Sequence, residues 1–340
     1  MLNSNRPRVA VYRAPLETSR LIAKTLRKAM QYRPKATTAA LLACTASAAQ
    51  ADPAFMQRWV QQFEDSEIVF QRGTTNVPFQ PLAFIDTTHY GESDIRRADG
   101  SSVSTRQTTV SQGAVLPFLV TPRDAFLIGD WVGWSRFDST SNELESFDVL
   151  SAGLPVGWFR QVNSQWQAGG FVMPLGHKAS GEDWSWETMA GGFARYVQSD
   201  RLWWAFGLYA DFNPGDDLYL PYVGASYAVN DHWTLSAVMP WPAVLYAPDD
   251  RTLYRLGVSP SGASWSSEKG KDDLQYELDT WDFGFSAERR VYGNLWLEGE
   301  LGVTGLTGMS IRGDDWEEPA FDVSNSPYIS IGINFRPGLN

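Results

Sequence analysis

The stretch NLWLEGELGVTGL, from Asn294 to Leu306, alternates like a β-strand with one apolar and one polar face. Successive strand side chains point to opposite faces, so the residues form two sets. The apolar set is Leu295, Leu297, Gly299, Leu301, Val303 and Gly305, and the polar set is Trp296, Glu298, Glu300, Gly302 and Thr304. In a soluble sandwich the apolar face would line a core. In a membrane barrel it would contact lipid, and the polar face would line the lumen.

Composition favours an all-β chain. The 340 residues include 15 Trp, 13 Tyr and 18 Phe beside 29 Gly and 19 Pro, a mixture of strand-favouring aromatics and turn formers. An apolar fraction of 43% with 20% charged residues is ordinary for a folded protein and argues against disorder.

The charge is unevenly distributed along the chain. Residues 1–51 hold nine of the basic residues and a single acid, Glu17, so the remainder carries 19 basic and 38 acidic residues. A nucleic-acid surface needs clustered basic residues. We therefore expect no nucleic-acid partner.

Residues 1–51 have the pattern of a signal peptide. Arg33 and Lys35 precede a modest apolar run, and AQA at residues 49–51 offers small residues for cleavage. The basic region before the apolar run is unusually long if synthesis starts at Met1. A start at Met30 would shorten it. The sequence LLAC, ending at Cys44, also resembles a lipidation motif. Export through a cleaved signal peptide to the outer membrane of a Gram-negative cell is the expected localisation.

Residues 52–80 are expected to form a periplasmic N-terminal segment with a short helix, because Phe55, Trp59, Val60 and Phe63 have helical spacing. Two roles are open for it. The segment could be a tether that packs on the end of a barrel, or a plug that enters its lumen.

Residues 81–337 are expected to form an outer-membrane β-barrel. Short turn-like connections such as VQSDR (197–201) and VYGN (291–294) alternate with longer polar loops such as ESDIRRADGSSVS. Tight turns at one end and longer loops at the other are typical of bacterial outer-membrane barrels. Outer-membrane lipid is then a partner of the chain.

Aromatic residues lie near the expected strand ends, as in the interfacial girdles of membrane proteins. The alternative is that they fill a soluble core. The tryptophans assigned to the two girdles are Trp158, Trp166, Trp203, Trp204, Trp233 and Trp296 near short turns, and Trp184 and Trp186 near long loops.

The fold class is therefore predicted as all-β, an antiparallel transmembrane β-barrel of twelve to fourteen strands with a short N-terminal helical segment. Both termini of such a barrel normally lie at the short-turn end, which requires an even count. Fourteen strands result if MPWPAV (239–244) reverses the chain, since its prolines cannot donate ladder hydrogen bonds.

Three runs carry a resemblance to a known family: DDLYLPYVGASYAVNDHWTLSAVMPWP, LYRLGVSPSGASW and ERRVYGNLWLEGELGVTGL. Between about Trp203 and Leu306 the chain resembles an uncharacterised family of Gram-negative outer-membrane β-barrel proteins, known only as a domain of unknown function. The resemblance implies location and architecture, and it implies no catalytic or ligand residues.

Charged residues inside the strands are the candidate functional residues. A charge facing lipid near the midplane costs about 2–4 kcal/mol for Arg or Lys, so these side chains are expected to face the lumen or a rim. The predicted lumen-lining residues are Asp211, Arg255, Asp282, Glu288, Arg290, Glu298 and Glu300. Four of them flank the VYGN turn, either as a salt-bridge network that stiffens the interior or as an acidic lining that favours cations.

The favoured function is a passive channel or transporter for small solutes with an acidic lumen. The alternative is a closed barrel with a structural or partner-binding role through its long loops, and the third possibility is an outer-membrane enzyme. We expect no enzyme, cofactor or metal site, because the three histidines lack ligand spacing and no Ser/His arrangement is recognisable. His89 is the one histidine worth testing. The final strand ends in an aromatic residue, Phe335, as the C-terminal strands recognised by the barrel-assembly machinery tend to. We therefore expect this machinery to be a partner of the chain.

Overall fold

The structure is a computed structural model that describes residues 61–62, 65–68, 75–96, 100–139, 146–212, 217–269, 272–312 and 321–337. The expected signal peptide, with Met30 and Cys44, lies outside the described residues, as does most of the helix expected within residues 52–80. Residues 61–62 are helical. In the described residues no helix is long and apolar enough to cross a membrane.

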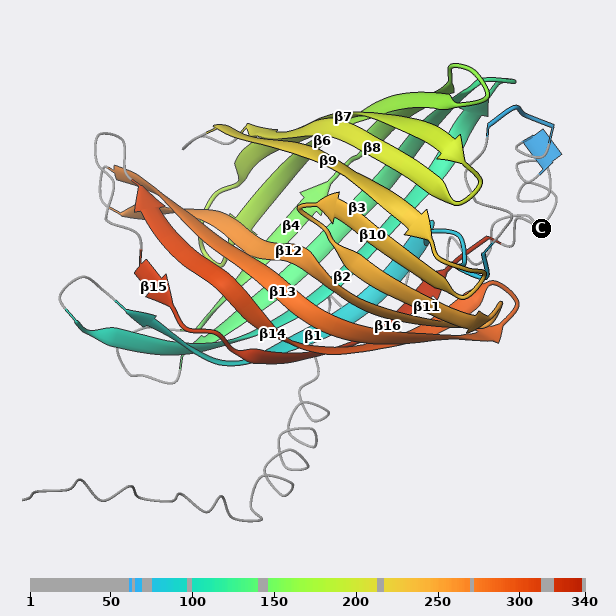
Figure 1. The fold of residues 1–340 in the computed structure, drawn as a ribbon. Coiled ribbons are helices and arrows are strands. Elements are labelled where there is room, and N and C mark those ends of the chain that lie inside the picture. The colour runs from blue at the N-terminus through green and yellow to red at the C-terminus, as the bar shows by residue number, and fades with distance from the viewer. Residues whose placement is uncertain are drawn as a thin grey trace, which may run out of the picture. The chain divides into compact units, whose positions relative to one another are not determined.

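The described residues form one antiparallel sheet of sixteen strands (Figure 1). The strands are β1 (Ala83–Arg96), β2 (Ser102–Val120), β3 (Asp124–Ser139), β4 (Phe147–Gly153), β5 (Val156–Gln161), β6 (Trp166–Ala179), β7 (Ser185–Ser199), β8 (Leu202–Phe212), β9 (Asp217–Ala228), β10 (Trp233–Met239), β11 (Ala243–Asp249), β12 (Thr252–Lys269), β13 (Asp272–Tyr292), β14 (Leu295–Arg312), β15 (Phe321–Val323) and β16 (Pro327–Phe335).

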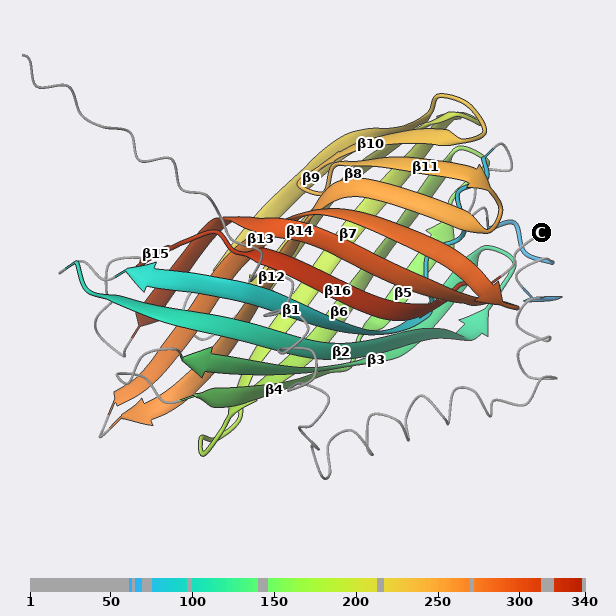
Figure 2. The same ribbon diagram turned by 90° about the horizontal axis from the view of Figure 1, so that it is seen from below.

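The sheet closes on itself as a barrel. The last long strand, β16, pairs with β14 on one side and with β1 on the other, and Figure 2 shows these three strands side by side. Strands β4 and β5 both pair with β3 and β6, and β15 and β16 both pair with β14 and β1. Strands β4 and β5 therefore share one position in the ring, and β15 and β16 share another. The sixteen strands occupy fourteen positions, which is within the predicted range of twelve to fourteen.

The segment MPWPAV reverses the chain as predicted. Strand β10 ends at Met239 and β11 begins at Ala243, and the Trp241 amide donates to the Val238 carbonyl oxygen at 2.8 Å across the turn. Each of these strands has seven residues. This turn lies partway along the wall of the barrel, because β9 and β12 both extend beyond it.

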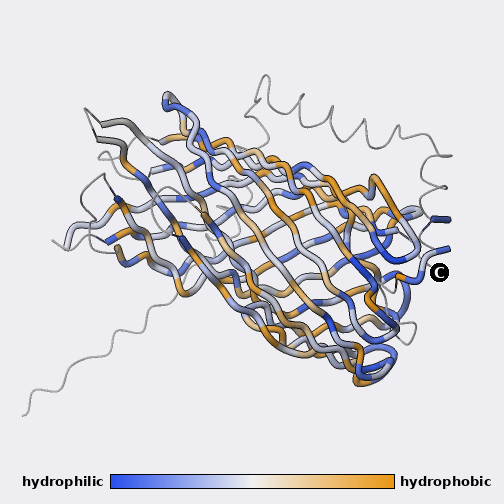
Figure 3. Tube along the Cα trace, turned by 90° about the horizontal axis from the view of Figure 1, so that it is seen from above, coloured by the Kyte–Doolittle hydropathy of each residue, from blue (hydrophilic) through white to orange (hydrophobic). Residues whose placement is uncertain are grey.

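The opening stretch forms β14, and its two faces separate as expected. Leu301 is 62% exposed and Leu297 is 47% exposed, whereas Trp296 is 3% exposed. Hydrophobic and hydrophilic residues are interspersed along the strands of the barrel (Figure 3).

Large apolar side chains cover the outside of the wall. Among those more than a third exposed are Phe206, Leu208, Val223, Leu235, Leu256, Phe283, Phe285, Ile329, Ile331 and Ile333. A soluble monomer rarely exposes so continuous an apolar surface, whereas a closed barrel with an apolar outer band satisfies both lipid and the backbone hydrogen bonds. The chain is an outer-membrane β-barrel.

Two of the tryptophans assigned to the girdles lie on the inner face instead. Trp203 and Trp296 are 7% and 3% exposed, and the guanidinium of Arg195 lies 3.7 Å from the Trp203 ring centroid. Placing them in an outward girdle from closeness to a turn was wrong, because strand parity, not distance from a turn, decides which face a side chain takes. The other six are 37–62% exposed: Trp158, Trp166, Trp184, Trp186, Trp204 and Trp233.

Candidate functional site

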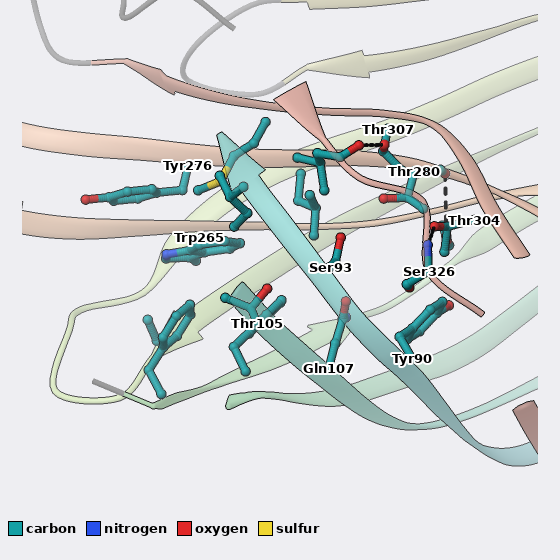
Figure 4. Close-up of a pocket in the computed structure, with 18 of the residues that line it drawn as sticks. Tyr90, Ser93, Thr105, Gln107, Trp265, Tyr276, Thr280, Thr304, Thr307 and Ser326 are labelled. Carbon is teal, nitrogen blue, oxygen red and sulfur yellow. Dashed lines mark hydrogen bonds between the residues drawn. The ribbon is translucent and has the colours of Figure 1, made fainter. Parts of the chain in front are cut away.

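The lumen contains two neighbouring cavities. The first, here called the loop-end cavity, has a volume of about 280 Å³ and lies near the long loops (Figure 4). The second, here called the central cavity, has a volume of about 650 Å³ and extends to residues 81–82 before β1. Tyr90, Ser261 and Leu278 line both cavities. The two cavities are therefore neighbours inside the barrel.

Aromatic rings form one side of the loop-end cavity. Trp265 and Tyr276 stack with ring centroids 5.3 Å apart at an interplanar angle of 2°, and Phe137 stacks on Phe147 at 4.9 Å. They belong to a cluster with the buried Val149, so strands β3, β4, β12 and β13 meet here across the lumen. This aromatic cluster narrows the loop end of the barrel.

Hydroxyl groups form the facing side of the same cavity (Figure 4). Thr304 Oγ1 accepts the amide of Ser326 at 2.8 Å, and Thr307 donates to the Val323 carbonyl oxygen. At the junction of the two cavities the Tyr90 hydroxyl donates to Asp282 Oδ2 at 2.9 Å. The cavity therefore offers aromatic surface opposite hydrogen-bonding groups.

The central cavity combines apolar and acidic side chains. Its apolar lining includes Phe84, Trp131, Met173, Leu175 and Met189, and its acidic lining includes Asp86, Glu187, Asp211, Glu277 and Asp279. Two Ser111 contacts of 2.8 and 2.9 Å stabilise Asp86, and Arg312 lies 3.9 Å from Glu277. The apolar lining suits a hydrophobic solute, and the carboxyl groups disfavour an anion.

A Ser–His–Glu arrangement lies beside this cavity, and sequence inspection missed it. The Ser151 hydroxyl lies 2.7 Å from His177 Nδ1, and His177 Nε2 lies 3.0 Å from Glu187 Oε1. Ser151 and His177 are direct partners on β4 and β6, and Glu187 is on β7. The three residues are spread over the sequence in no known motif, so only strand pairing could reveal them.

The position of Ser151 argues against nucleophilic catalysis. The Ser151 side chain is buried, at 9% exposure, and lines neither the loop-end cavity nor the central cavity. His177 and Glu187, in contrast, line the central cavity. A nucleophile must reach a carbonyl carbon, and an oxyanion needs donors that strand pairing has not already used. The arrangement is better suited to holding Glu187 in place.

A buried polar network lies at the short-turn end of the lumen. Arg336 donates to both oxygens of Glu288 at 2.7 Å, and Asn334 donates to Glu288 at 3.1 Å and to Glu298 at 2.6 Å. Arg336 also donates to the Phe79 carbonyl oxygen at 2.7 Å. These residues, Glu288, Glu298, Asn334 and Arg336, are called the basal network below.

The structure changes the expected partnership at the VYGN turn. Arg290 lies at the rim, where its guanidinium donates to the Gly293 carbonyl oxygen and lies 4.0 Å from Asp250. The cation that neutralises Glu288 is Arg336, from the segment after the last strand.

The remaining predicted lumen residues have separate surroundings. Glu300 accepts a hydrogen bond from the Tyr328 hydroxyl at 2.5 Å, Asp211 accepts one from Tyr209 at 3.3 Å, and Arg255 donates to the Val258 carbonyl oxygen at 3.0 Å. Asp211 lines the central cavity and Asp282 touches Tyr90 at its junction. The predicted set is thus distributed along the barrel and does not form one cluster.

The N-terminal segment contacts the short-turn mouth on two opposite sides. Ile68 is buried against Ala125 and Phe159, while Val77 packs against the buried Leu253 and Trp296. Nearby, Glu67 pairs with Arg123 at 2.7 Å, and the Asn76 amide donates to the Asp231 carbonyl oxygen at 2.8 Å. These contacts are with inward-facing residues at the mouth.

His89 lies on the outer face of β1, away from the cavities. Its Nδ1 is 2.9 Å from the hydroxyl of Thr108, its partner on β2, whereas the neighbouring Thr88 and Tyr90 line the central cavity. His232, at a short turn, lies 3.0 Å from the Asn76 amide nitrogen. In the described parts of the chain no three His, Cys, Asp or Glu side chains are grouped to hold a metal.

Solved structures similar to this chain include outer-membrane channels. The COG4313 outer membrane channel from Pseudomonas putida F1 has a TM-score of 0.44 and 11% identity, covering 78% of this chain and 99% of that one. A Pseudomonas aeruginosa FadL homologue has a TM-score of 0.42 and 11% identity, covering 80% and 96%. The Pseudomonas putida toluene transporter TodX has a TM-score of 0.33 and 10% identity, covering 75% and 88%.

No protein-family model matches this chain. No curated protein matches it either. The barrel of this chain follows from its own strand pairing, and what the similar channels carry is a property of those channels.

Proposed function

We propose that the protein is a passive channel for small amphipathic or apolar solutes. The main support is a pair of neighbouring cavities inside the barrel, of about 280 and 650 Å³, whose linings share Tyr90, Ser261 and Leu278. Small-molecule sites are typically concave, mostly apolar spaces of about 300–1,000 Å³ with a few polar groups. The lumen of this barrel has that size and lining.

The acidic groups of the lumen supply the proposed selectivity. Glu187, Asp211 and Glu277 line the central cavity, and Glu298 and Glu300 lie nearer the short-turn end. A carboxyl-lined passage disfavours anions and favours neutral or cationic solutes. We propose that the seven charged residues predicted from the sequence line the lumen and set its charge. Arg336 offsets part of the negative charge, since it pairs with Glu288.

A substitution at the junction of the cavities tests the channel. Leu278→Trp places a larger ring where the two cavities meet and should abolish uptake of the fluorescent amphiphile N-phenyl-1-naphthylamine by cells that express the protein. Phe285→Trp, on the lipid-facing side of the same strand, is the matched control and should keep full uptake. Equal uptake by cells with and without the protein would overturn the proposal.

A closed barrel with a structural or partner-binding role is the second candidate. Side chains lie in both ends of the lumen, which favours this second candidate. The aromatic cluster lies at the loop end, and the basal network and the N-terminal segment lie at the short-turn end. Deletion of residues 313–320 separates the candidates, since a loop-dependent partner would be lost while uptake of the amphiphile would persist.

The two ends of the sequence are proposed to direct the protein to the outer membrane. Residues 1–51 would act as a cleaved signal peptide, and the final strand would engage the barrel-assembly machinery through Phe335. Blocked cleavage after Ala51→Asp, detected as a heavier product, would test the first step. An unchanged mass in that variant would place cleavage elsewhere.

A further inference from the structure

The barrel wall is incomplete between β9 and β12. Strand β10 pairs with β9 only as far as Met239 opposite Val223, and β11 pairs with β12 only as far as Ala243 opposite Gly257. In the described sheet, residues 217–222 of β9 and 259–269 of β12 have no ladder partner on the sides that face each other. The β10–β11 hairpin stops short of both neighbours (Figure 1).

Each unpaired edge carries a proline. Pro221 lies two residues beyond the last β9 residue paired with β10, and Pro260 lies two residues beyond Val258, whose amide donates to the Pro242 carbonyl oxygen at 3.1 Å. Proline has no N–H to donate to a neighbouring strand, and natural sheets use it to keep edges unpaired. The sequence thus disfavours closing the wall or adding a strand here.

Strand β12 also turns into the lumen, away from β9. Ser264 and the lipid-facing Leu256 are eight residues apart with no register shift between them, so they lie on the same face of β12. Yet the Ser264 hydroxyl donates to Glu187 of β7 at 3.0 Å, inside the barrel. The other face of β12 packs through Trp265 on Val149 and Ala179.

The central cavity lies directly behind this break in the wall. Residues 260–264, within the unpaired part of β12, line it, together with Glu187 of β7 and Asp211 of β8. At the lower border Trp241 packs edge-on against Tyr222, with ring centroids 5.6 Å apart. Outside, Val223, Met239 and Leu256 are 57–59% exposed, so the approach from lipid is apolar.

We propose that the break between β9 and β12 is a lateral opening, through which a small amphipathic or apolar solute passes between the central cavity and the outer leaflet. This rests on the proposed channel function. Long loops mark the extracellular end of such barrels, and the unpaired segments lie on that side of the β10–β11 turn. The aromatic cluster narrows the route through the loop end of the lumen, and the N-terminal segment narrows the route through the short-turn end. The break in the wall provides a third route, through the side of the barrel.

Reversible closure of the opening tests the proposal. Cys44 is the only cysteine, so a Cys44→Ala background allows Leu220→Cys and Ser259→Cys to be joined across the break with bifunctional methanethiosulfonates of increasing length. Joining should reduce uptake of N-phenyl-1-naphthylamine to the level of cells without the protein, and dithiothreitol should restore it. Ala190→Cys with Ala210→Cys, direct partners in the intact wall, should leave uptake unchanged when treated identically.

The outcomes separate the two proposals. Uptake that persists after the break is joined, but is abolished by Leu278→Trp, overturns the lateral route and leaves the channel standing. No uptake by the unmodified protein overturns the channel itself.

Contact with lipid gives a second measurement that does not depend on joining the two edges. p-Benzoylphenylalanine at position 220 should form photo-adducts with lipid, whereas the same group in place of Thr109, which faces the central cavity from the intact wall, should not. Failure of position 220 to label lipid, or equal labelling at both positions, overturns the lateral opening.

Discussion

Arg336 and Glu288 form a buried two-pronged ion pair, with contacts of 2.7 Å from Arg336 Nη2 to both carboxylate oxygens of Glu288 and with side chains only 7% and 4% exposed. The pair joins β13 to the residue that follows the last strand. It therefore ties the C-terminal end of the chain into the ring where the barrel closes.

Removing Arg336 should destabilise the barrel strongly. Breaking a buried pair by removing one partner costs about 3–5 kcal/mol, because the remaining charge is buried without compensation. Arg336→Ala should therefore lower the temperature at which the folded barrel loses its compact gel mobility. Arg290→Ala, at the rim, is the control and should change this temperature little. Equal effects of the two substitutions would contradict the assignment of Arg336 as the main partner.

The outward face of β14 should reject a charge. Leu301 is 62% exposed, and Arg on the lipid-facing side near the midplane costs about 2–4 kcal/mol. Leu301→Arg should lower the free energy of unfolding in lipid vesicles by that amount. Glu300→Gln, one residue away on the inner face, retains an acceptor for Tyr328 and should cost much less. A Leu301→Arg variant as stable as wild type would place this face away from lipid.

The central cavity should prefer cationic over anionic amphiphiles. Replacing Glu187 and Asp211 by Gln and Asn removes two negative charges from its lining while keeping the size of the side chains. The ratio of cationic to anionic probe uptake should fall in this double variant. Glu92→Gln, an exposed residue paired with Arg106 at 2.8 Å, is the control. An unchanged ratio would show that lumen carboxyl groups do not set selectivity.

His177 should contribute to stability and not to hydrolysis. His177→Ala removes the partner of the buried Ser151 hydroxyl and one contact of Glu187, which keeps its hydrogen bond from Ser264. An unsatisfied buried polar group costs about 1–3 kcal/mol. The variant should unfold more easily, and Ser180→Ala serves as a control at an exposed serine. Ester hydrolysis by the wild-type protein that disappears in Ser151→Ala would contradict this and favour an enzyme.

Shortening the N-terminal segment should open the short-turn mouth. Ile68 and Val77 pack against inward-facing residues on opposite sides of it. Removal of residues 62–77 should therefore raise the ion conductance of the protein in planar bilayers. Glu67→Gln, which weakens a surface pair only, should leave the conductance near the wild-type value. A conductance unchanged by the deletion would favour a tether over a plug.

Local pattern was sufficient for the barrel and much of its wall. Side-chain alternation has a period of two in every strand, so the two faces of β14 could be assigned from Leu297, Glu298 and their neighbours alone. Proline chemistry likewise located the β10–β11 reversal at MPWPAV. The same rule, applied to Trp203 and Trp296 in place of their closeness to turns, would have put both rings inside.

The sequence by itself determined the fold class, the apolar outer face and the even ring, because these depend on alternation and turn chemistry, which are local. Tertiary structure alone decided which residues meet across the lumen: Arg336 with Glu288, Ser151 with His177, and Ser264 with Glu187. Such contacts depend on register and on the inward turn of β12, and no local pattern encodes either. The prolines at 221 and 260 were visible from the start, but only strand pairing placed them on the two edges of one opening.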